Sequence, residues 1–298
     1  MTGRGVAALL GAFTAGALGT VAAARALMSR PPGGVERWTR KSFAGRPVTL
    51  FEGPAYAVGA VSGALAGGAG APAVVAGLGA AAFGALDDLA GDGSSKGLRG
   101  HLAAAGRGEL TTGVIKIVGL GACGLLAARM VDRSAGRTGL TATLVGGAVI
   151  AGSANIANLL DLRPGRALKV VLLVAAPIVA GGGTSSSPSA TAASRATAAA
   201  AAGAAMAAMP DDLAGRSMLG DTGANSAGAL LGTALVARAG PGGRLVALAV
   251  VTALTLASEK VSFTKVIEST PGLRELDALG RTSQPSRPSL SSPSPGSQ

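Results

Sequence analysis

The stretch from Gly53 to Leu86, GPAYAVGAVSGALAGGAGAPAVVAGLGAAAFGAL, contains no charged residue. At about 1.5 Å per residue it is long enough for two helical crossings of a bilayer, each of roughly 17 residues. Its middle, GGAGAP at 67–72, combines glycine with proline, which favours a tight turn. We therefore predict a helical hairpin within a membrane, with its tip at 67–72.

The composition of the whole chain also indicates a membrane protein. Hydrophobic residues make up 48% of the chain and charged residues 14%, whereas a soluble domain carries about 25% charged residues. Aromatic residues are only 2%, while glycine occurs 48 times, a composition that suits closely packed membrane helices. The single cysteine, Cys123, excludes an internal disulfide. We expect an all-α, multi-pass protein of the cell membrane.

Apolar runs predict about nine crossings within a membrane domain that covers residues 1–279. These runs are 5–28, two within 53–86, 111–128, 140–155, 170–183, 197–209, 222–237 and 245–258. The loop after the first run holds Arg30, Arg37, Arg40, Lys41 and Arg46. By the positive-inside rule this loop is cytoplasmic, which puts the N-terminus outside and the C-terminus in the cytoplasm.

Three other segments are interpreted from composition. The first run has a cleaved signal peptide as its alternative, because small residues at 22–26 permit cleavage. The stretch 181–194, GGGTSSSPSATAAS, is expected to be a flexible external connection. The Ser/Pro-rich tail 280–298 is expected to be disordered.

The net charge of +11 does not by itself indicate a nucleic-acid partner. Cytoplasmic loops of membrane proteins collect Lys and Arg in any case. No basic stretch of this chain is interleaved with aromatic residues. We expect no nucleic acid among its partners.

Acidic residues follow the predicted topology. Each loop assigned to the cytoplasm after the first carries them at a membrane boundary: Asp87, Asp88, Asp92, Asp161, Asp211, Asp212 and Asp221. Asp132 is the exception, in a connection assigned to the outside, and we expect its replacement by Asn to be nearly silent. Carboxylates beside hydrocarbon are costly, so their clustering at one interface indicates a functional site. For Asp211 or Asp212 alone, solvation of a loop end is the simpler interpretation.

Three short motifs carry the chemistry. In FGALDDLAGD, Asp87 and Asp88 are adjacent at a helix end, where like charges are tolerated best if a cation bridges them. In NIANLLD, the oxygen-bearing side chains at 155, 158 and 161 fall near one helix face and suit Mg²⁺, with a polar stripe between helices as the alternative. In LGDTGANSAG, Asp221 begins a span, where free N–H groups favour an anion.

These motifs, in this order and on alternating spans, resemble the polyprenyl-phosphate N-acetylhexosamine-1-phosphate transferases, the family that includes MraY and WecA. The segment KGL after the first motif fits the same pattern, and RKSFAGRPVTLFEGP resembles the first cytoplasmic loop of that family. Pro54 stands where a second glycine is usual in the family. The resemblance extends from about Arg40 to Gly232.

The resemblance implies transfer of a sugar-1-phosphate from a nucleotide sugar to a polyprenyl phosphate, with Mg²⁺ or, as an alternative, Mn²⁺. The implied partners are these two substrates, the bilayer and a second copy in a homodimer. The implied metal ligands are Asp88, Asn158 and Asp221. The implied catalytic carboxylates are Asp87, Asp88 and Asp161, and the implied substrate-binding residues are Lys41, Lys96, Asn155, Arg163 and Arg166.

The chain also departs from the family. Pro164 stands where the family has an acid that contacts the nucleobase, so we expect Arg163 and Arg166 to bind donor phosphate instead. Orientation of the loop toward the cytoplasm is the alternative role of these arginines. The last cytoplasmic loop, SEKVSFTKVIES, lacks the histidine cluster of the family, and the single histidine of the chain, His101, lies in another loop. The tenth span of the family is also missing.

Two other classes of function stay open on the sequence. The first is a non-catalytic or regulatory membrane protein on the same scaffold, which the missing recognition elements favour. The second is a transporter, for which a charge in the middle of a span is expected. Lys116 is the clear candidate in the sequence, and it lies close enough to a span end to snorkel.

Overall fold

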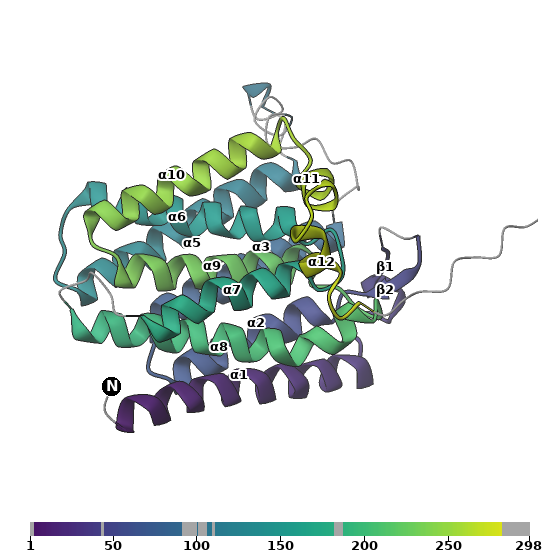
Figure 1. Cartoon of the computed structure of the whole chain (residues 1–298), viewed down its shortest axis with the longest axis horizontal. Helices are drawn as coiled ribbons and strands as arrows, with labels where there is room; N and C mark the ends of the chain where they lie inside the picture. The colour runs from purple at the N-terminus through teal and green to yellow at the C-terminus, as the bar shows by residue number, and fades with distance from the viewer. Residues whose placement is uncertain are drawn as a thin grey trace, which may run out of the picture.

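A computed structural model describes residues 3–42, 45–90, 100, 106–108, 111–181 and 187–281 of the chain. Over these residues the fold is almost entirely helical, as the sequence predicts. Long helices lie side by side along one direction in Figure 1. Their bounds are α1 (Gly3–Ser29), α2 (Glu52–Ala66), α3 (Ala71–Ala90), α5 (Thr112–Ser134), α6 (Leu140–Leu160), α7 (Arg166–Ala180), α8 (Pro188–Leu213), α9 (Gly220–Arg238) and α10 (Pro241–Ser258).

The hairpin predicted from the uncharged stretch is confirmed. Helices α2 and α3 are joined by the turn 67–70, in which Gly68 and Gly70 adopt φ angles of 83° and 71°. These left-handed angles favour glycine over residues with a Cβ atom. The Ala69 N–H donates to the Ala64 carbonyl at 2.9 Å and closes the end of α2.

Shorter elements gather at one end of the bundle (Figure 1). They are a 3₁₀ turn η1 (Glu36–Trp38), strands β1 (Thr39–Lys41) and β2 (Pro47–Thr49), and helices α11 (Phe263–Ser269) and α12 (Leu273–Ala278). The antiparallel strands pair Arg40 with Val48, an arrangement that the sequence did not predict. Trp38 and Phe51 pack at the base of this hairpin, with ring centroids 5.8 Å apart.

Several helices are longer than the predicted spans, and two of them, α5 and α8, extend into stretches predicted to be external connections. Helix α5 continues beyond residue 128, so Asp132 lies in its last turn and not in an external connection. Helix α8 begins at Pro188, inside the stretch expected to be a flexible connection. The Ser187 side chain accepts a hydrogen bond from the Ala190 N–H at 3.3 Å, and proline suits the first helical position. This local N-cap overrides the loop-like composition.

Helix α9 occupies the interior of the bundle and packs against α3, α6, α8 and α2. Its residues are buried along most of its length. The close packing depends on small residues: a Cβ atom at Gly228 would collide with the carbonyl oxygen of Ser153 in α6. Backbone-to-backbone packing of this kind is typical of membrane helices.

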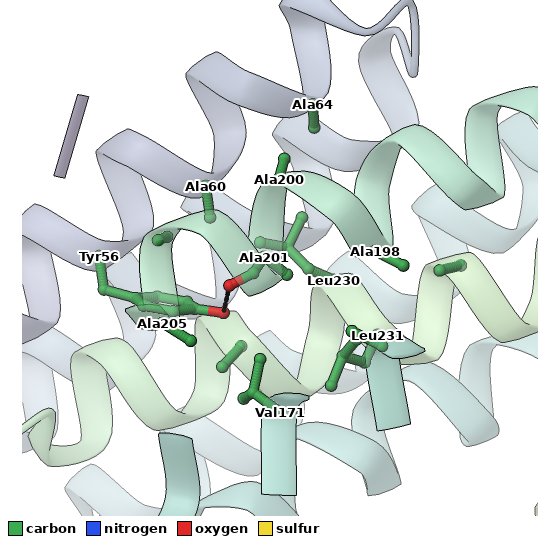
Figure 2. Close-up of a cluster of buried hydrophobic side chains, with 14 of the residues drawn as sticks. Tyr56, Ala60, Ala64, Val171, Ala198, Ala200, Ala201, Ala205, Leu230 and Leu231 are labelled. Atoms are coloured by element: carbon green, nitrogen blue, oxygen red, sulfur yellow. Dashed lines mark hydrogen bonds between the residues drawn. The ribbon is translucent and has the colours of Figure 1, made fainter. Parts of the chain in front are cut away.

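Alanine dominates the largest hydrophobic core, which Figure 2 shows in close-up. Tyr56 from α2 lies among alanines of α8, and its hydroxyl donates a hydrogen bond to the Ala201 carbonyl at 3.3 Å. Leu230 and Leu231 of α9 and Val171 of α7 fill the remaining space. The few large side chains therefore lie where alanine-lined helices leave room.

Five helices among the described residues are long and apolar enough to cross a membrane: α1, α3, α5, α6 and α10. Helices α2 and α7 have 15 residues each, which corresponds to about 22 Å, less than the hydrocarbon thickness of about 30 Å. Helices α8 and α9 carry buried polar groups such as Ser194 and Asn225. Because other helices surround them, these two do not need a uniformly apolar surface.

Candidate functional site

Several helix ends meet at one end of the bundle. The C-terminal ends of α3, α6 and α8 lie there together with the N-terminal ends of α2 and α9. Gly84 lets α3 approach α9, because a Cβ atom at this position would collide with the Asp221 carbonyl. These ends bring six carboxylates into one region, which we call the acidic cluster: Glu52, Asp87, Asp88, Asp161, Asp212 and Asp221.

Asp88 closes the N-terminus of α9. One carboxylate oxygen accepts the Asp221 N–H at 3.0 Å, and the other accepts the Thr222 N–H at 2.8 Å and the Thr222 hydroxyl at 2.6 Å. The sequence indicates that the start of α9 offers free N–H groups to an anion. In the structure the Asp88 carboxylate, from a distant part of the chain, already accepts two of these N–H groups. The contact does bring the motifs FGALDDLAGD and LGDTGANSAG together.

Lys116 joins two members of the acidic cluster. Its ammonium lies 2.7 Å from Asp87 Oδ2 and also forms an ion pair with Asp221. All three side chains are partly buried. A positive charge from α5 is thus held between carboxylates of α3 and α9, in the position where a bridging cation is expected for such a pair.

Asp161 is a buried carboxylate of the acidic cluster that lies outside the predicted spans. It ends α6 as the C-cap residue, and its side chain accepts a hydrogen bond from the Gly220 N–H. Its Oδ2 is buried and has no hydrogen-bond partner among the described residues. Burial, together with the negative charges of Asp212, Asp221 and Asp88, raises the pKa of Asp161 well above its usual range.

Two members of the cluster depart from expectation. Asp212 lies in the last turn of α8 and its side chain is buried. It is therefore not the solvated loop-end residue that the sequence suggests. Glu52, which lies outside the three sequence motifs, is also buried and accepts a hydrogen bond from the Ser217 hydroxyl. Each has one buried carboxylate oxygen without a partner among the described residues. An acidic residue directly before an uncharged run, as in FEGP, was the available signal for Glu52.

The three residues of the motif NIANLLD separate at the end of α6. Asn155 and Asn158 lie in the helix, and Asp161 is its cap. Within the described residues, no hydrogen bond connects the Asn155 or Asn158 side chain to the acidic cluster. No set of three His, Cys, Asp or Glu side chains in the described chain converges tightly enough to form a metal site. The ligand set predicted from the sequence stays a prediction.

The residues expected to bind substrate fall into three groups. Lys41 is exposed at the end of β1, and Lys96 lies outside the described residues. Arg163 forms an ion pair with Glu268 at 2.5 Å. Arg166 is buried and donates two hydrogen bonds to Asp277, at 2.8 and 3.0 Å. Phosphate binding by either arginine stays a prediction and requires these internal pairs to open.

A second buried polar group lies at the opposite end of the same helices. Arg244 of α10 pairs with Asp132 at 2.7 Å and donates hydrogen bonds to the carbonyls of Val236 and Ala142. Asp132 also accepts the Thr143 hydroxyl at 2.9 Å. Asp132 is therefore an internal structural residue and not the exposed loop residue expected from the sequence.

The chain matches no protein-family model and no curated protein. The resemblance to the transferase family therefore rests on the motifs of the sequence.

Proposed function

We propose that this protein transfers a sugar-1-phosphate from a nucleotide sugar to a polyprenyl phosphate at the cytoplasmic face of the cell membrane. The observation that carries the proposal is the contact of Asp88 with the Asp221 and Thr222 N–H groups. It joins two motifs that the resemblance assigns to one site, although they lie far apart in the chain. Five helices long and apolar enough to cross a membrane support the same function, because the acceptor is a membrane lipid.

The proposed reaction places chemical demands on the site. A bond forms between an acceptor phosphate oxygen and the phosphorus of the sugar phosphate, the bridging P–O bond breaks, and a nucleoside monophosphate leaves. Negative charge spreads over the phosphate oxygens during this transfer, so the site needs fixed positive charge. Lys116, held between Asp87 and Asp221, supplies one such charge.

The donor atoms of the acidic cluster fit magnesium in chemical type. Mg²⁺ prefers oxygen ligands and binds through one or two carboxylates together with substrate phosphates. Asp87, Asp161 and Asp221 provide carboxylates, and the unpartnered Oδ2 of Asp161 leaves negative charge uncompensated. Bound Mg²⁺, or Mn²⁺ in its place, would neutralise phosphate charge during transfer. A site of this type needs few protein ligands, because the substrate phosphates complete it.

The proposal includes a topology of nine crossings, with the N-terminus outside and the C-terminus in the cytoplasm. The acidic cluster then lies on the cytoplasmic side, and the Asp132–Arg244 pair lies near the outer side. Lys41 and Thr138 are both exposed and belong to opposite ends of the bundle. In a Cys123→Ser background, Lys41→Cys and Thr138→Cys should react with an impermeant thiol reagent from opposite sides. Labelling of both from one side would contradict this topology.

The activity test uses purified protein, polyprenyl phosphate and a panel of nucleotide sugars, with release of nucleoside monophosphate as the readout. We expect Mg²⁺-dependent release by the wild type and a loss of about 100-fold or more in Asp221→Asn, because a group that stabilises developing charge is typically worth this much. Asp211→Asn is the matched control, since Asp211 is an exposed acid paired with Arg216. It should keep activity close to that of the wild type.

The second candidate is a non-catalytic membrane protein on the same scaffold. Two observations favour it: Lys116 already compensates Asp87 and Asp221, and Arg166 is already bound to Asp277. The activity experiment separates the two candidates. No release from any donor by a folded wild type would favour the non-catalytic protein. More than a tenth of wild-type turnover in Asp221→Asn would instead contradict the placing of Asp221 in the catalytic site.

A further inference from the structure

Residues 259–281, which we call the rim segment, continue from the end of α10 and contain α11 and α12. Helix α10 has Arg244 as its one buried residue and exposes large apolar side chains, so it faces lipid along most of its length. The rim segment then passes over the start of α7 and reaches Leu213 at the end of α8. It follows the edge of the bundle, at the end seen beside β1 and β2 in Figure 1.

One side of the rim segment is fixed to the protein by ion pairs. Asp277 is buried and accepts two hydrogen bonds from Arg166, and Glu268 pairs with Arg163. Lys169 donates a hydrogen bond to the Asp277 carbonyl at 2.7 Å. The acids of the inner side are thus neutralised by arginines of the α6–α7 connection and the start of α7.

The remaining surface of α12 divides into two sides. At about 100° per residue, Leu273 and Leu276 fall on one side of α12, next to the buried Asp277, and Leu279 follows as the C-cap residue. Arg274 and Glu275 fall on the opposite arc and pair with each other. The three leucines are 46%, 43% and 65% exposed. An exposed group of leucines of this kind indicates a surface that contacts a membrane or another protein.

Helix α11 repeats the division. Thr264 bonds Arg166 on the inner side, next to Glu268. Phe263, Val266 and Ile267 share a second arc, and Lys265 and Ser269 share a third. Both short helices therefore present one side to the protein, one apolar side and one polar side.

We propose that the rim segment docks on the bilayer at the boundary between headgroups and acyl chains. Three observations select lipid as the occupant: the segment continues directly from a lipid-facing helix, it follows the edge of the bundle, and its apolar arc carries no acid. Lys260 and Lys265 are exposed and suit the phosphates of headgroups. This inference depends on the protein being in a membrane, and not on the transferase reaction.

Single-cysteine spin labelling of the full chain in lipid nanodiscs tests the proposal, because Cys123→Ser removes the native thiol. Labels at Leu276→Cys and Val266→Cys are compared with matched labels at Arg274→Cys and Lys265→Cys. We expect the first two to collide at least three times more often with oxygen, which partitions into lipid, than with a water-soluble nickel chelate. The second two should show the reverse preference.

Equal access of the nickel chelate to positions 276 and 274 would overturn the proposal. Protection of position 276 from both probes would also overturn it, because that result means a protein occupant, a second copy included. Elution of each labelled variant as a single species and an unchanged thermal transition confirm that it is folded. Nucleoside monophosphate release is not used as a readout, so failure of the proposed function would leave this test intact.

Discussion

Helices α5, α6 and α9 carry a buried polar group at each end, and the two groups are built differently. At one end, Asp132 and Arg244 are buried together as an ion pair; Asp132 also accepts the Thr143 hydroxyl, and Arg244 donates to backbone carbonyls. At the other end, six carboxylates lie in one region and Lys116 pairs with two of them, Asp87 and Asp221. Glu52, Asp161 and Asp212 each have a buried oxygen without a hydrogen-bond partner among the described residues and no ion pair there.

The difference separates a structural role from a functional one. A buried pair of opposite charges holds helices in register, and breaking it leaves a charge in a medium of low dielectric constant. Buried carboxylates that no opposite charge compensates cost free energy of folding, so a protein that keeps them has another use for them. We therefore assign the Asp132–Arg244 end to stability and the acidic cluster to ligand binding.

The largest effect is expected at the structural end. Arg244→Met leaves Asp132 buried without its partner, and we expect a loss of about 3–5 kcal/mol in the free energy of unfolding. Thermal unfolding in nanodiscs measures this loss. The double variant Asp132→Leu/Arg244→Met removes both charges and should recover most of it. If the double variant is as unstable as the single variant, the pair is not what stabilises this end.

A smaller effect is expected where Asp88 caps α9 within the acidic cluster. Asp88→Ala removes the acceptor for the first N–H groups of α9, and loss of such a cap costs about 1–2 kcal/mol. Asp88→Asn keeps one acceptor oxygen and should cost less. Thermal unfolding of both variants, beside Asp211→Ala as an exposed control, checks the order. Equal stability of Asp88→Ala and the control would mean that Asp88 does not hold α9.

Much of this comparison was not accessible from the sequence. The uncharged run 53–86 predicts the α2–α3 hairpin correctly, because both length and turn residues are local properties. The acidic residues at 87, 88 and 221 could be selected because each lies at the end of an apolar run. The partner of Asp132 could not be predicted, since Arg244 lies far along the chain and looks like an ordinary interfacial arginine.

The same limit applies to the acidic cluster and the rim segment. Asp212 resembles a solvated loop residue in PDDLAGR, and its burial depends on how α8 ends against its neighbours. The sequence suggests phosphate binding by Arg166 because Pro164 stands where the family has an acid. In the structure the Arg166 guanidinium donates two hydrogen bonds to Asp277, which lies far along the chain. The β1–β2 hairpin was missed because its strands are only three residues long, and β1 carries two basic side chains.

The comparison also predicts a pH dependence. Since the pKa of Asp161 is raised in the folded protein, the folded chain keeps a proton that the unfolded chain releases. The stability of the metal-free protein should therefore fall as the pH rises above the ordinary range of an aspartate. Asp161→Asn cannot ionise and should lose the part of this dependence that Asp161 contributes, which thermal unfolding between pH 5 and pH 8 would show. Burial raises the pKa of Glu52 and Asp212 as well, so these two carboxylates should keep the remainder.

The most direct test of the two roles is thermal unfolding of Asp161→Asn and Asp132→Asn in metal-free nanodiscs at about pH 7.5, where an ordinary aspartate is ionised. Asp161→Asn removes an uncompensated carboxylate, so its transition should move above that of the wild type. Asp132→Asn leaves Arg244 buried and unpaired, so its transition should move below the wild type, by about 3 kcal/mol or more in stability. Shifts of opposite sign support the account. Destabilisation of both variants to a similar extent would contradict it.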